Sequence, residues 1–363
     1  MAAMTALTTR VPGLSAAINP ARRIGSGSPR FAYVGAIETA GIHVYAIDGG
    51  QWNAQQFIAA EAPASMALHP SGHTLYVANE VMEYRGLPRG AVEAFSIEEK
   101  TGRLTLLGRE PLSLSATMPR HIAVAPDGRS LIVASHGGGI YNQLPILADG
   151  QLGRVDSVLK ETGCGPIQGY QESAHPQAVC FDPAGNRFIA ADLGTDRVSV
   201  FSTADGLSAQ ARFELPAGSG PRQLALHPNG NLLYVSHALD GSISGLRYDA
   251  NTGKITERLI GIRGGVGEAL AMHPSGEFLF TAGKGEIAAW QIDSSSGALR
   301  YVQSKNLDRK QSVREMIVLP QRHQLAVLTD RGILSIAIEF ETGRLGVPVL
   351  MASAPGARSI AIL

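Results

Sequence analysis

One phrase recurs along this chain and constrains its fold more than any other feature. It consists of a short apolar strand, a proline, a small turn residue and a glycine, followed by a second apolar strand, as in RQLALHPNGNLLYVSH and RHIAVAPDGRSLIVASH. Proline presets φ at the start of such a turn, and glycine accepts the positive φ that reverses the chain. A sixth copy keeps the proline without the glycine. The turn prolines are Pro70, Pro126, Pro183, Pro228, Pro274 and Pro320.

The spacing of these prolines predicts the size of the repeating unit. They recur at intervals of roughly 45 to 57 residues, and four short strands with their turns need about 40–50 residues. Two further strands follow the phrase in most copies. After Pro228, for example, GSISGLRYD and ITERLIGI are separated by the turn NTGK. Apolar residues alternate or run at strand length in these segments, so each copy predicts one four-stranded antiparallel blade.

The two ends of the chain supply the missing strands of a seventh copy. The C-terminal segment ARSIAIL is an inner strand that stops where its proline would stand, and the N-terminal segments FAYVGAI, GIHVYAID and QQFIAAEA are three strands without an inner one. We therefore predict an all-β, seven-bladed β-propeller whose last blade is closed by the C-terminal inner strand plus three N-terminal strands. Closure of this kind removes the exposed sheet edge. The second strands are expected to begin near Phe31, Leu75, Leu131, Phe188, Leu232, Phe278 and Leu325.

The charge balance excludes one class of partner. Lys+Arg and Asp+Glu each total 31 among 363 residues, so the net charge is near zero. General binding to nucleic acids or anionic membranes requires a basic surplus that this chain lacks, and no apolar run is long enough to span a bilayer. We therefore expect no nucleic-acid and no membrane partner.

Residues 1–29 are predicted to be a disordered leader, and residues 30–363 a single propeller domain. The leader lacks the continuous apolar run of a signal peptide. It is interrupted by Pro12, Asn19 and Pro20. The two cysteines, Cys164 and Cys180, are too few for a disulfide framework and have no metal-knuckle spacing. These features favour a cytoplasmic protein, and a closed ring that needs no partner for stability favours a monomer.

The repeat also predicts which side chains gather at one mouth of the central channel. Inner strands line the channel of a propeller, and each second strand returns, so the start of one and the end of the other share a face. Six residues before each turn proline, or at the equivalent place in the last blade, stand Ala64, Arg120, Gln177, Arg222, Glu268, Arg314 and Arg358. The ends of the second strands add Glu80, His136, Asp192, His237 and Asp330.

Four arginines at one channel mouth predict a small anionic ligand. Their planar guanidinium groups suit the oxygens of a carboxylate or a phosphate. The alternative is that each arginine pairs with a carboxylate in a ring of salt bridges, with candidates Glu80, Asp192, Glu268 and Asp330. Arginines close to one axis repel one another unless something anionic lies between them, which favours the ligand for the four together.

Three segments of the chain resemble a known family. GSGPRQLALHPNGNLLYVSHALD, ESAHPQAVCFDPAGNRFIAADLGTDRVSVF and MPRHIAVAPDGRSLIVASHGGG are similar to the lactonase family of seven-bladed propellers. That family includes the propeller-type 6-phosphogluconolactonases and the fungal carboxymuconate lactonizing enzymes. The resemblance covers roughly residues 31–363, and its Gly-Pro-Arg-x-Leu-Ala-x-His-Pro phrase is fairly specific. It implies that the protein opens or forms the ring of a small acidic lactone without a metal or an organic cofactor.

The resemblance also implies site residues. The arginine of the family's Gly-Pro-Arg phrase matches Arg222, its later inner-strand arginine matches Arg314, and the first histidine of its Ser-His-Pro-His phrase matches His175. This chain departs from the family at three places: the second histidine of that phrase is Gln177, the histidine that often follows the Gly-Pro-Arg arginine is Gln223, and the family's Asn-Glu pair is His237-Ala238.

Lactone hydrolysis needs a base that deprotonates water and a donor that stabilises the tetrahedral oxyanion. His175 is the first candidate for the base, because imidazole titrates near neutrality, and Arg222 and Arg314 are candidates for binding the acid group or the oxyanion. Further candidate substrate-binding residues are Glu80, Arg120, His121, His136, Gln177, His237, Glu268 and Arg358. A loop histidine that only bonds a neighbouring blade remains the alternative for His175, His136 and His237. Histidines directly before turn prolines, namely His69, His227 and His273, are expected to be structural.

Two classes of function therefore stay open. The first is a hydrolase that opens a phosphorylated or carboxylated sugar lactone in the manner of a 6-phosphogluconolactonase. The second is a non-catalytic propeller that binds an anionic metabolite or a protein partner, because a fold alone does not determine function. Ala238, which stands where the family has an acid, favours the second class. A lactonizing isomerase is a lesser third possibility.

Overall fold

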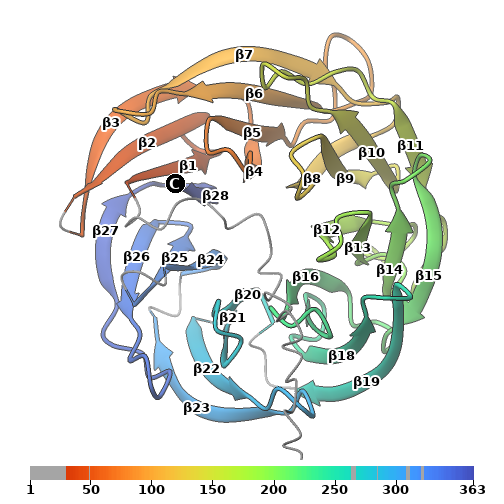
Figure 1. The fold of residues 1–363 in the computed structure, drawn as a ribbon, viewed down its shortest axis with the longest axis vertical. Coiled ribbons are helices and arrows are strands. Elements are labelled where there is room, and N and C mark those ends of the chain that lie inside the picture. Colours follow the sequence, from red (N-terminus) through yellow and green to blue (C-terminus); the bar gives the residue numbers. More distant parts are fainter. Residues whose placement is uncertain (1–29, 49, 263–266, 284, 308–310, 320–322) are drawn as a thin grey trace, which may run out of the picture.

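Seven four-stranded antiparallel sheets are arranged around a central channel (Figure 1). The computed structural model describes residues 30–363 except residues 49, 263–266, 284, 308–310 and 320–322. The predicted leader over residues 1–29 lies outside the described residues. The all-β, seven-bladed propeller predicted from the repeat is confirmed.

Each blade runs from an inner strand at the channel to an outer strand at the rim. The inner strands are β4 (Pro63–Leu68), β8 (Thr117–Val124), β12 (Pro176–Phe181), β16 (Pro221–Leu226), β20 (Ala269–Met272), β24 (Val313–Leu319) and β28 (Ala357–Ile362). The second strands are β1 (Phe31–Ala36), β5 (Thr74–Asn79), β9 (Ser130–Gly137), β13 (Arg187–Asp192), β17 (Leu232–His237), β21 (Phe278–Gly283) and β25 (Gln324–Thr329). Each second strand begins within one residue of its predicted start.

The outer half of each blade has the same order. The third strands are β2 (Gly41–Asp48), β6 (Ala91–Ile97), β10 (Ile140–Pro145), β14 (Arg197–Ser202), β18 (Ile243–Asp249), β22 (Glu286–Ile292) and β26 (Gly332–Ala337). The outer strands are β3 (Gln51–Ala59), β7 (Leu104–Pro111), β11 (Ser157–Lys160), β15 (Ser208–Glu214), β19 (Lys254–Ile262), β23 (Leu299–Asn306) and β27 (Val349–Ser353).

The ring is closed by pairing between the two ends of the chain. Strand β28 lies antiparallel to β1, from Ala32 opposite Ile362 to Ala36 opposite Ala357 (Figure 1). The last blade therefore has the order β28-β1-β2-β3, as the incomplete copies at the two ends predict. Because its inner strand comes from one terminus and the other three from the opposite terminus, opening the ring requires breaking this sheet.

The turn between inner and second strand forms as its sequence indicates. The glycines of five copies, Gly72, Gly128, Gly185, Gly230 and Gly276, have φ between 73° and 79°. This left-handed conformation is costly for any residue with a Cβ atom. The corresponding turn of the sixth copy includes residues 320–322, which lie outside the described residues.

The hydrophobic core is a ring of interfaces between neighbouring blades. Strands β1, β5, β17 and β21 are buried at every position. One core cluster joins Tyr76 and Val92 of the β4–β7 blade to Ile122, Leu131 and Val133 of the β8–β11 blade. The blades are thus held together mainly by apolar side chains that reach the next sheet, and the channel is left to polar groups.

Histidines before the turn prolines tie successive blades together, as predicted. His69 donates an Nε2–H hydrogen bond to the carbonyl oxygen of Gly128 (3.0 Å), and His227 does the same to Gly276 (2.8 Å). Each bond therefore reaches the turn glycine of the following blade. The Nδ1 atom of His273 lies 2.8 Å from Ser275 Oγ.

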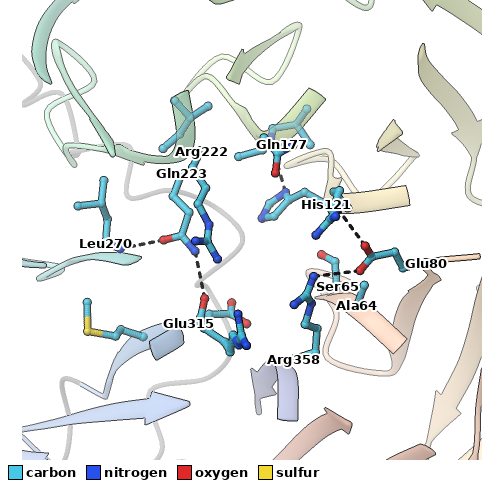
Figure 2. A pocket seen from close by; sticks show the side chains of 16 residues that line it. Ala64, Ser65, Glu80, His121, Gln177, Arg222, Gln223, Leu270, Glu315 and Arg358 are labelled. Carbon is cyan, nitrogen blue, oxygen red and sulfur yellow. Dashed lines mark hydrogen bonds and ion pairs between the residues drawn. The ribbon is translucent and has the colours of Figure 1, made fainter. Parts of the chain in front are cut away.

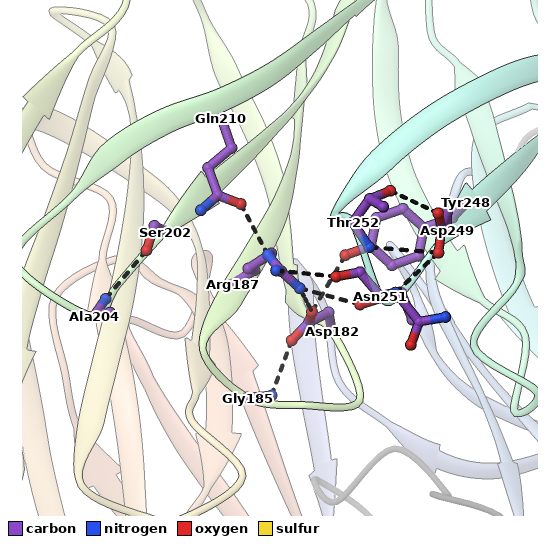
Figure 3. A network of polar contacts seen from close by, with 11 residues as sticks. Asp182, Gly185, Arg187, Ser202, Ala204, Gln210, Tyr248, Asp249, Asn251 and Thr252 are labelled. Carbon is purple, nitrogen blue, oxygen red and sulfur yellow. Dashed lines mark hydrogen bonds and ion pairs between the residues drawn. The ribbon is translucent and has the colours of Figure 1, made fainter.

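In the β12–β15 blade the equivalent position is a buried aspartate, Asp182 (Figure 3). Its Oδ2 accepts hydrogen bonds from Arg187 Nη1 (3.4 Å) and Tyr248 Oη (3.3 Å), and its Oδ1 accepts one from the Gly185 amide (2.9 Å). Arg187 also donates to the Ala250 carbonyl (3.1 Å). Tyr248 and Ala250 belong to the next blade, so this ion pair performs the task that histidine performs elsewhere.

We expect Asp182→Ala to lower the free energy of unfolding by about 3–5 kcal/mol, because it leaves the largely enclosed Arg187 guanidinium without its carboxylate partner and the Tyr248 hydroxyl without its acceptor. Equilibrium denaturation measures the change. The control is Asp205→Ala, an exposed aspartate of the same blade, which should change the value by less than about 0.5 kcal/mol. Equal effects of the two substitutions would contradict a structural role for the ion pair.

Candidate active site

The channel mouth holds a polar cavity of about 190 Å³ to which all seven inner strands contribute (Figure 2). It lies where inner strands start and second strands end, as the repeat alignment predicts. Seven of the predicted site residues line it: Glu80, Arg120, His121, Gln177, Arg222, Arg314 and Arg358. The predicted residues that do not line it are His136, His175, His237 and Glu268.

A bulge in the inner strands explains why the cavity is so polar. Six inner strands shift register against their second strands, and each shift skips one residue. The skipped residues are Ala64, Arg120, Gln177, Arg222, Arg314 and Arg358, the predicted mouth positions. Because a bulge leaves one residue out of the ladder and re-aims its side chain, both the skipped residue and the next can face the cavity. Strand β20 pairs with β21 without a register shift. Glu268, which precedes β20, does not line the cavity.

Two of the four arginines share one glutamate as their ion-pair partner. Glu80, at the end of β5, lies with Oε1 3.0 Å from Arg120 Nε and with Oε2 3.3 Å from Arg358 Nη2. Burial, aided by the charge of Arg358, lowers the pKa of Arg120, and Glu80 opposes that shift. The salt-bridge alternative weighed from the sequence therefore holds for Arg120 and Arg358, with Glu80 as the shared partner.

The other two arginines have no such partner. In the part of the chain that the structure describes, no carboxylate lies within ion-pair distance of Arg222 or Arg314. Burial lowers the pKa of Arg222, the charges of Arg314 and Arg358 lower it further, and Glu268 acts in the opposite direction. Figure 2 shows Arg222 and Arg358 extending toward the middle of the cavity from opposite sides. An anion placed between the arginines would relieve their mutual repulsion.

His136 and His175 stand beside the cavity rather than in its lining. Their rings stack at 4.3 Å between centroids, and His175 donates its Nδ1–H to the carbonyl oxygen of His136 (3.0 Å). Gln177, which does line the cavity, donates from Nε2 to His136 Nδ1 (2.7 Å). Burial, followed by the charges of Arg120 and His175, lowers the pKa of His136 to about 3. His136 is thus neutral near pH 7 and orients the Gln177 amide.

His237 is placed away from the cavity. Its side chain is fully buried, and its Nε2 lies 2.9 Å from Ser244 Oγ of the third strand of its own blade. Burial lowers its pKa to about 4. The physical reason is that side chains alternate between the two faces of the sheet along β17. This alternation turns the His237 ring away from the channel mouth. His237 therefore does not stand in for the acid that the family has at the position of Ala238.

His121 lines the cavity and also fastens two blades. Its Nδ1 accepts a hydrogen bond from the backbone amide of Val179 (3.4 Å) on the neighbouring inner strand. Burial lowers its pKa to about 4. The imidazole is therefore neutral near pH 7, with Nε2–H as the donor end.

Several lining residues were not predicted from the sequence, and one of them carries a carboxyl group: Glu315, which follows Arg314 on β24. Its Oε2 accepts a hydrogen bond from the backbone amide of Ile360 on β28 (3.0 Å). Burial raises its pKa to about 7, against the lowering effect of that bond. Strand alternation would turn Glu315 away from the channel, whereas the bulge at Arg314 lets both residues face it.

Other residues at the same repeat position make the equivalent bond, which is the signal that could have revealed Glu315. The Ser65 hydroxyl accepts from the Ile122 amide (3.2 Å), and Gln223 Oε1 accepts from the Leu270 amide (2.8 Å). Together with His121 and Glu315, they connect four inner strands, β4, β8, β16 and β24, each to the next inner strand through a side chain and a backbone amide. Aligning the residue after each mouth position would have found a carboxyl in this series.

Among the described residues, no three His, Cys, Asp or Glu side chains gather as ligands for a metal ion. In the same part of the chain, no helix is long and apolar enough to cross a membrane.

Comparison with known proteins identifies relatives along most of the chain. Residues 31–357 match the family model described as lactonase, 7-bladed beta-propeller. The Bacillus subtilis protein named 6-phosphogluconolactonase is 28% identical over 227 residues, which are 59% of this chain and 64% of that protein. This chain thus spans just under two thirds of that relative. A Formosa agariphila protein of the same name is 25% identical over 284 residues, or 72% of this chain and 78% of that protein.

Solved structures show the same architecture. The periplasmic gluconolactonase PpgL of Pseudomonas aeruginosa superposes with a TM-score of 0.83 and 25% identity, covering 93% of this chain and 99% of that chain. A Lactobacillus plantarum protein superposes with a TM-score of 0.79 and 22% identity, covering 92% and 99%.

We expect Arg222→Ala to weaken binding of inorganic phosphate about 10- to 150-fold, the loss of one charge-assisted interaction of about 1.5–3 kcal/mol. Isothermal titration calorimetry at fixed ionic strength measures this. The matched control is Arg247→Ala, an arginine outside the cavity that pairs with Glu257, which should leave the affinity unchanged. Equal affinity of the Arg222→Ala variant and the wild type would place the anion elsewhere.

Proposed function

Because this chain belongs to the lactonase family of seven-bladed β-propellers, we propose that it hydrolyses a small acidic sugar lactone. The observation that carries the proposal is the pair Arg222 and Arg314, which face the cavity without a carboxylate at ion-pair distance among the described residues. The curated relatives named 6-phosphogluconolactonase support a phosphorylated gluconolactone as the substrate.

The cavity fits this chemistry in charge and in size. Its volume of about 190 Å³ is below the ~300–1,000 Å³ of sites for drug-sized ligands, which suits one sugar ring with its acid group projecting to the mouth. Arg222 and Arg314 bind the phosphate or carboxylate, or stabilise the oxyanion that forms when water attacks the lactone carbonyl. Arg120 and Arg358, oriented by Glu80, add to the positive field.

We propose that the reaction uses no metal ion and no organic cofactor. The guanidinium groups repel cations from the cavity, and they supply the electrophilic assistance that a metal would otherwise provide. A monomeric, cytoplasmic protein of carbohydrate metabolism is part of the same proposal. The closed ring and the two free thiols, Cys164 and Cys180, support it.

One observation favours a second candidate, a propeller that binds an acidic metabolite without turnover. The two residues expected from the family to act on protons are not in the cavity: His175 lies beside its lining, and Ala238 replaces an acid. A binding module would use the same arginines and bind the lactone and its ring-opened product.

A hydrolysis assay over several lactones separates the two functions. We expect the wild type to open 6-phosphogluconolactone and carboxylated lactones well above their spontaneous rates, and uncharged gluconolactone less well, because only the acids engage the arginines. Arg222→Ala and Arg314→Ala should each lower kcat/KM by about 10- to 150-fold. Arg247→Ala serves again as the control.

Each outcome decides between the functions. Spontaneous opening must be measured in parallel, since it is fast for gluconolactones. If the wild type gives no rate above it, yet binds phosphate through Arg222, the binding module is correct. If the His175→Ala variant alone abolishes turnover, the histidine beside the cavity acts as the base.

A further inference from the structure

We propose that Glu315 is the carboxyl group that transfers protons in this cavity, an inference that rests on the proposed lactone hydrolysis. No function is implied for this position by the family resemblance, which points to His175 and to the place of Ala238. The assignment follows from where the bulged inner strand puts the carboxyl group and from what its two oxygens contact.

Glu315 is held in place and still has an open oxygen. Its Oε2 accepts the Ile360 amide hydrogen (3.0 Å), which fixes the carboxyl against β28. No donor in the described part of the chain bonds Oε1, and the residue lines the cavity. Figure 2 shows Glu315 on the same side of the cavity as Arg358 and across from His121. A water molecule or a lactone oxygen in the cavity can therefore reach Oε1.

The other proton acceptors of the lining are poor candidates. Of the described side chains that line the cavity, only Glu80, His121 and Glu315 can accept a proton near neutral pH, because arginine stays protonated. Both oxygens of Glu80 are held at ion-pair distance by guanidinium groups, which makes Glu80 a counter-ion of the arginines. His121 has a pKa of about 4 and uses Nδ1 as an acceptor for Val179.

The electrostatic environment of the Glu315 carboxyl group favours proton transfer. Burial raises its pKa to about 7 and the Ile360 amide lowers it, so both forms are populated near neutrality. A general acid–base group works best when its pKa lies near the working pH. The charged groups that line the same cavity are Arg314 on its own strand, Arg358, Arg222, Arg120 and Glu80. Glu268, which precedes β20, lies outside the lining and acts on the charge of Arg222.

The step balances without a co-reactant. The Glu315 carboxylate takes a proton from water as the water oxygen bonds to the lactone carbonyl carbon, and the carbonyl oxygen becomes an oxyanion facing an arginine. When the ring C–O bond breaks, the protonated Glu315 returns that proton to the departing ring oxygen, which becomes a hydroxyl group. The product is the ring-opened hydroxy acid, which loses its carboxyl proton to solvent.

Glu315→Gln is the decisive variant, because its amide oxygen still accepts from Ile360 while it can no longer take up a proton. We expect kcat/KM for 6-phosphogluconolactone to fall by about 100-fold or more, with a smaller change in KM. In the wild type, kcat/KM should rise with pH through about 7 as Glu315 ionises, and this limb should be absent from the residual activity of the variant.

The control is Ser359→Ala, at the equivalent position of β28. Ser359 donates to the Pro63 carbonyl (3.3 Å) and is not part of the cavity lining, so its loss removes a contact between blades without touching the site. A Glu315→Gln variant that keeps the wild-type rate and pH limb overturns the proposal while hydrolysis stands. A wild type without turnover overturns hydrolysis itself.

Stability provides a readout that does not depend on activity. A raised carboxyl pKa means that the folded state binds the proton more tightly than the unfolded chain, so wild-type stability falls as pH rises from the unfolded value through about 7. The Tm of Glu315→Gln relative to wild type should therefore increase between about pH 5 and pH 8. A Tm difference that is constant over this range would show that Glu315 does not titrate there.

A second, independent observation concerns a hollow of about 510 Å³ on the outer side of the ring, between β7 and the segment that precedes β11. Four arginines line it: Arg85, Arg89, Arg109 and Arg154. Glu110 is the one acidic residue among the described residues of this lining. We name this feature the outer hollow.

The arginines of the outer hollow differ in whether they have a carboxylate partner. Arg109 pairs with Glu93 and lies over the Tyr84 ring. Among the described residues, Arg85, Arg89 and Arg154 have no carboxylate at ion-pair distance, and the Nε–H of Arg89 is buried without an acceptor. The guanidinium groups of the hollow repel one another, and an anion bound between them would offset this repulsion. We infer that the outer hollow binds a small phosphorylated metabolite, its phosphate on Arg89 and Arg154.

Phosphate binding in a protein without the channel site tests this inference. Calorimetric titration of the Arg222→Ala/Arg314→Ala double variant with inorganic phosphate should still show salt-sensitive binding. Adding Arg89→Gln should weaken it about 10-fold or more, the loss of one charge-assisted bond. Adding Arg247→Ala instead should not. Absence of binding in the double variant, or equal binding after Arg89→Gln, overturns the outer site.

Discussion

Pairing of β28 with β1 is the contact on which the rest of this structure depends. The pairing joins residues at opposite ends of the chain. It closes the seven sheets into a ring, in which every sheet packs against a neighbour on both faces. Only in a closed ring do all inner strands start at one mouth. The position of every cavity residue, from Arg120 on β8 to Arg358 on β28, is therefore a consequence of closure and cannot be produced by any one blade.

Closure brings like charges together, and the inner strands accommodate them with a bulge. Each skipped residue leaves the ladder and is freed to face the channel. Glu80 is the shared ion-pair partner of Arg120 and Arg358, whereas no carboxylate among the described residues lies at ion-pair distance from Arg222 or Arg314. The apolar interfaces between blades, such as the cluster around Tyr76 and Leu131, hold the ring against this repulsion.

The sequence predicts most of the fold because each turn is encoded locally. A proline and a glycine at a fixed offset mark the turn between inner and second strand in five copies, so the starts of the second strands are predicted within one residue. The same offset predicts the skipped residues, such as Arg222. It fails for His237, whose ring bonds Ser244 of its own blade. His175, which the family resemblance and not the offset indicates, lies beside the cavity lining. The offset does not predict Glu315, because side-chain alternation alone would turn it away from the channel. The bulge at Arg314 changes this direction, and a bulge is a property of strand pairing.

The two carboxyl groups of the cavity show why the surroundings, and not the residue type, assign roles. Glu80 faces guanidinium groups with both oxygens, which makes it a fixed counter-ion. Glu315 has one neutral amide donor and is otherwise enclosed, so its charged form is disfavoured and its pKa is raised to about 7. Two carboxyl groups in different surroundings are the arrangement from which separate roles are assigned in hydrolytic sites. This chain places the second carboxyl group, Glu315, on an inner strand, although it has no acid at Ala238.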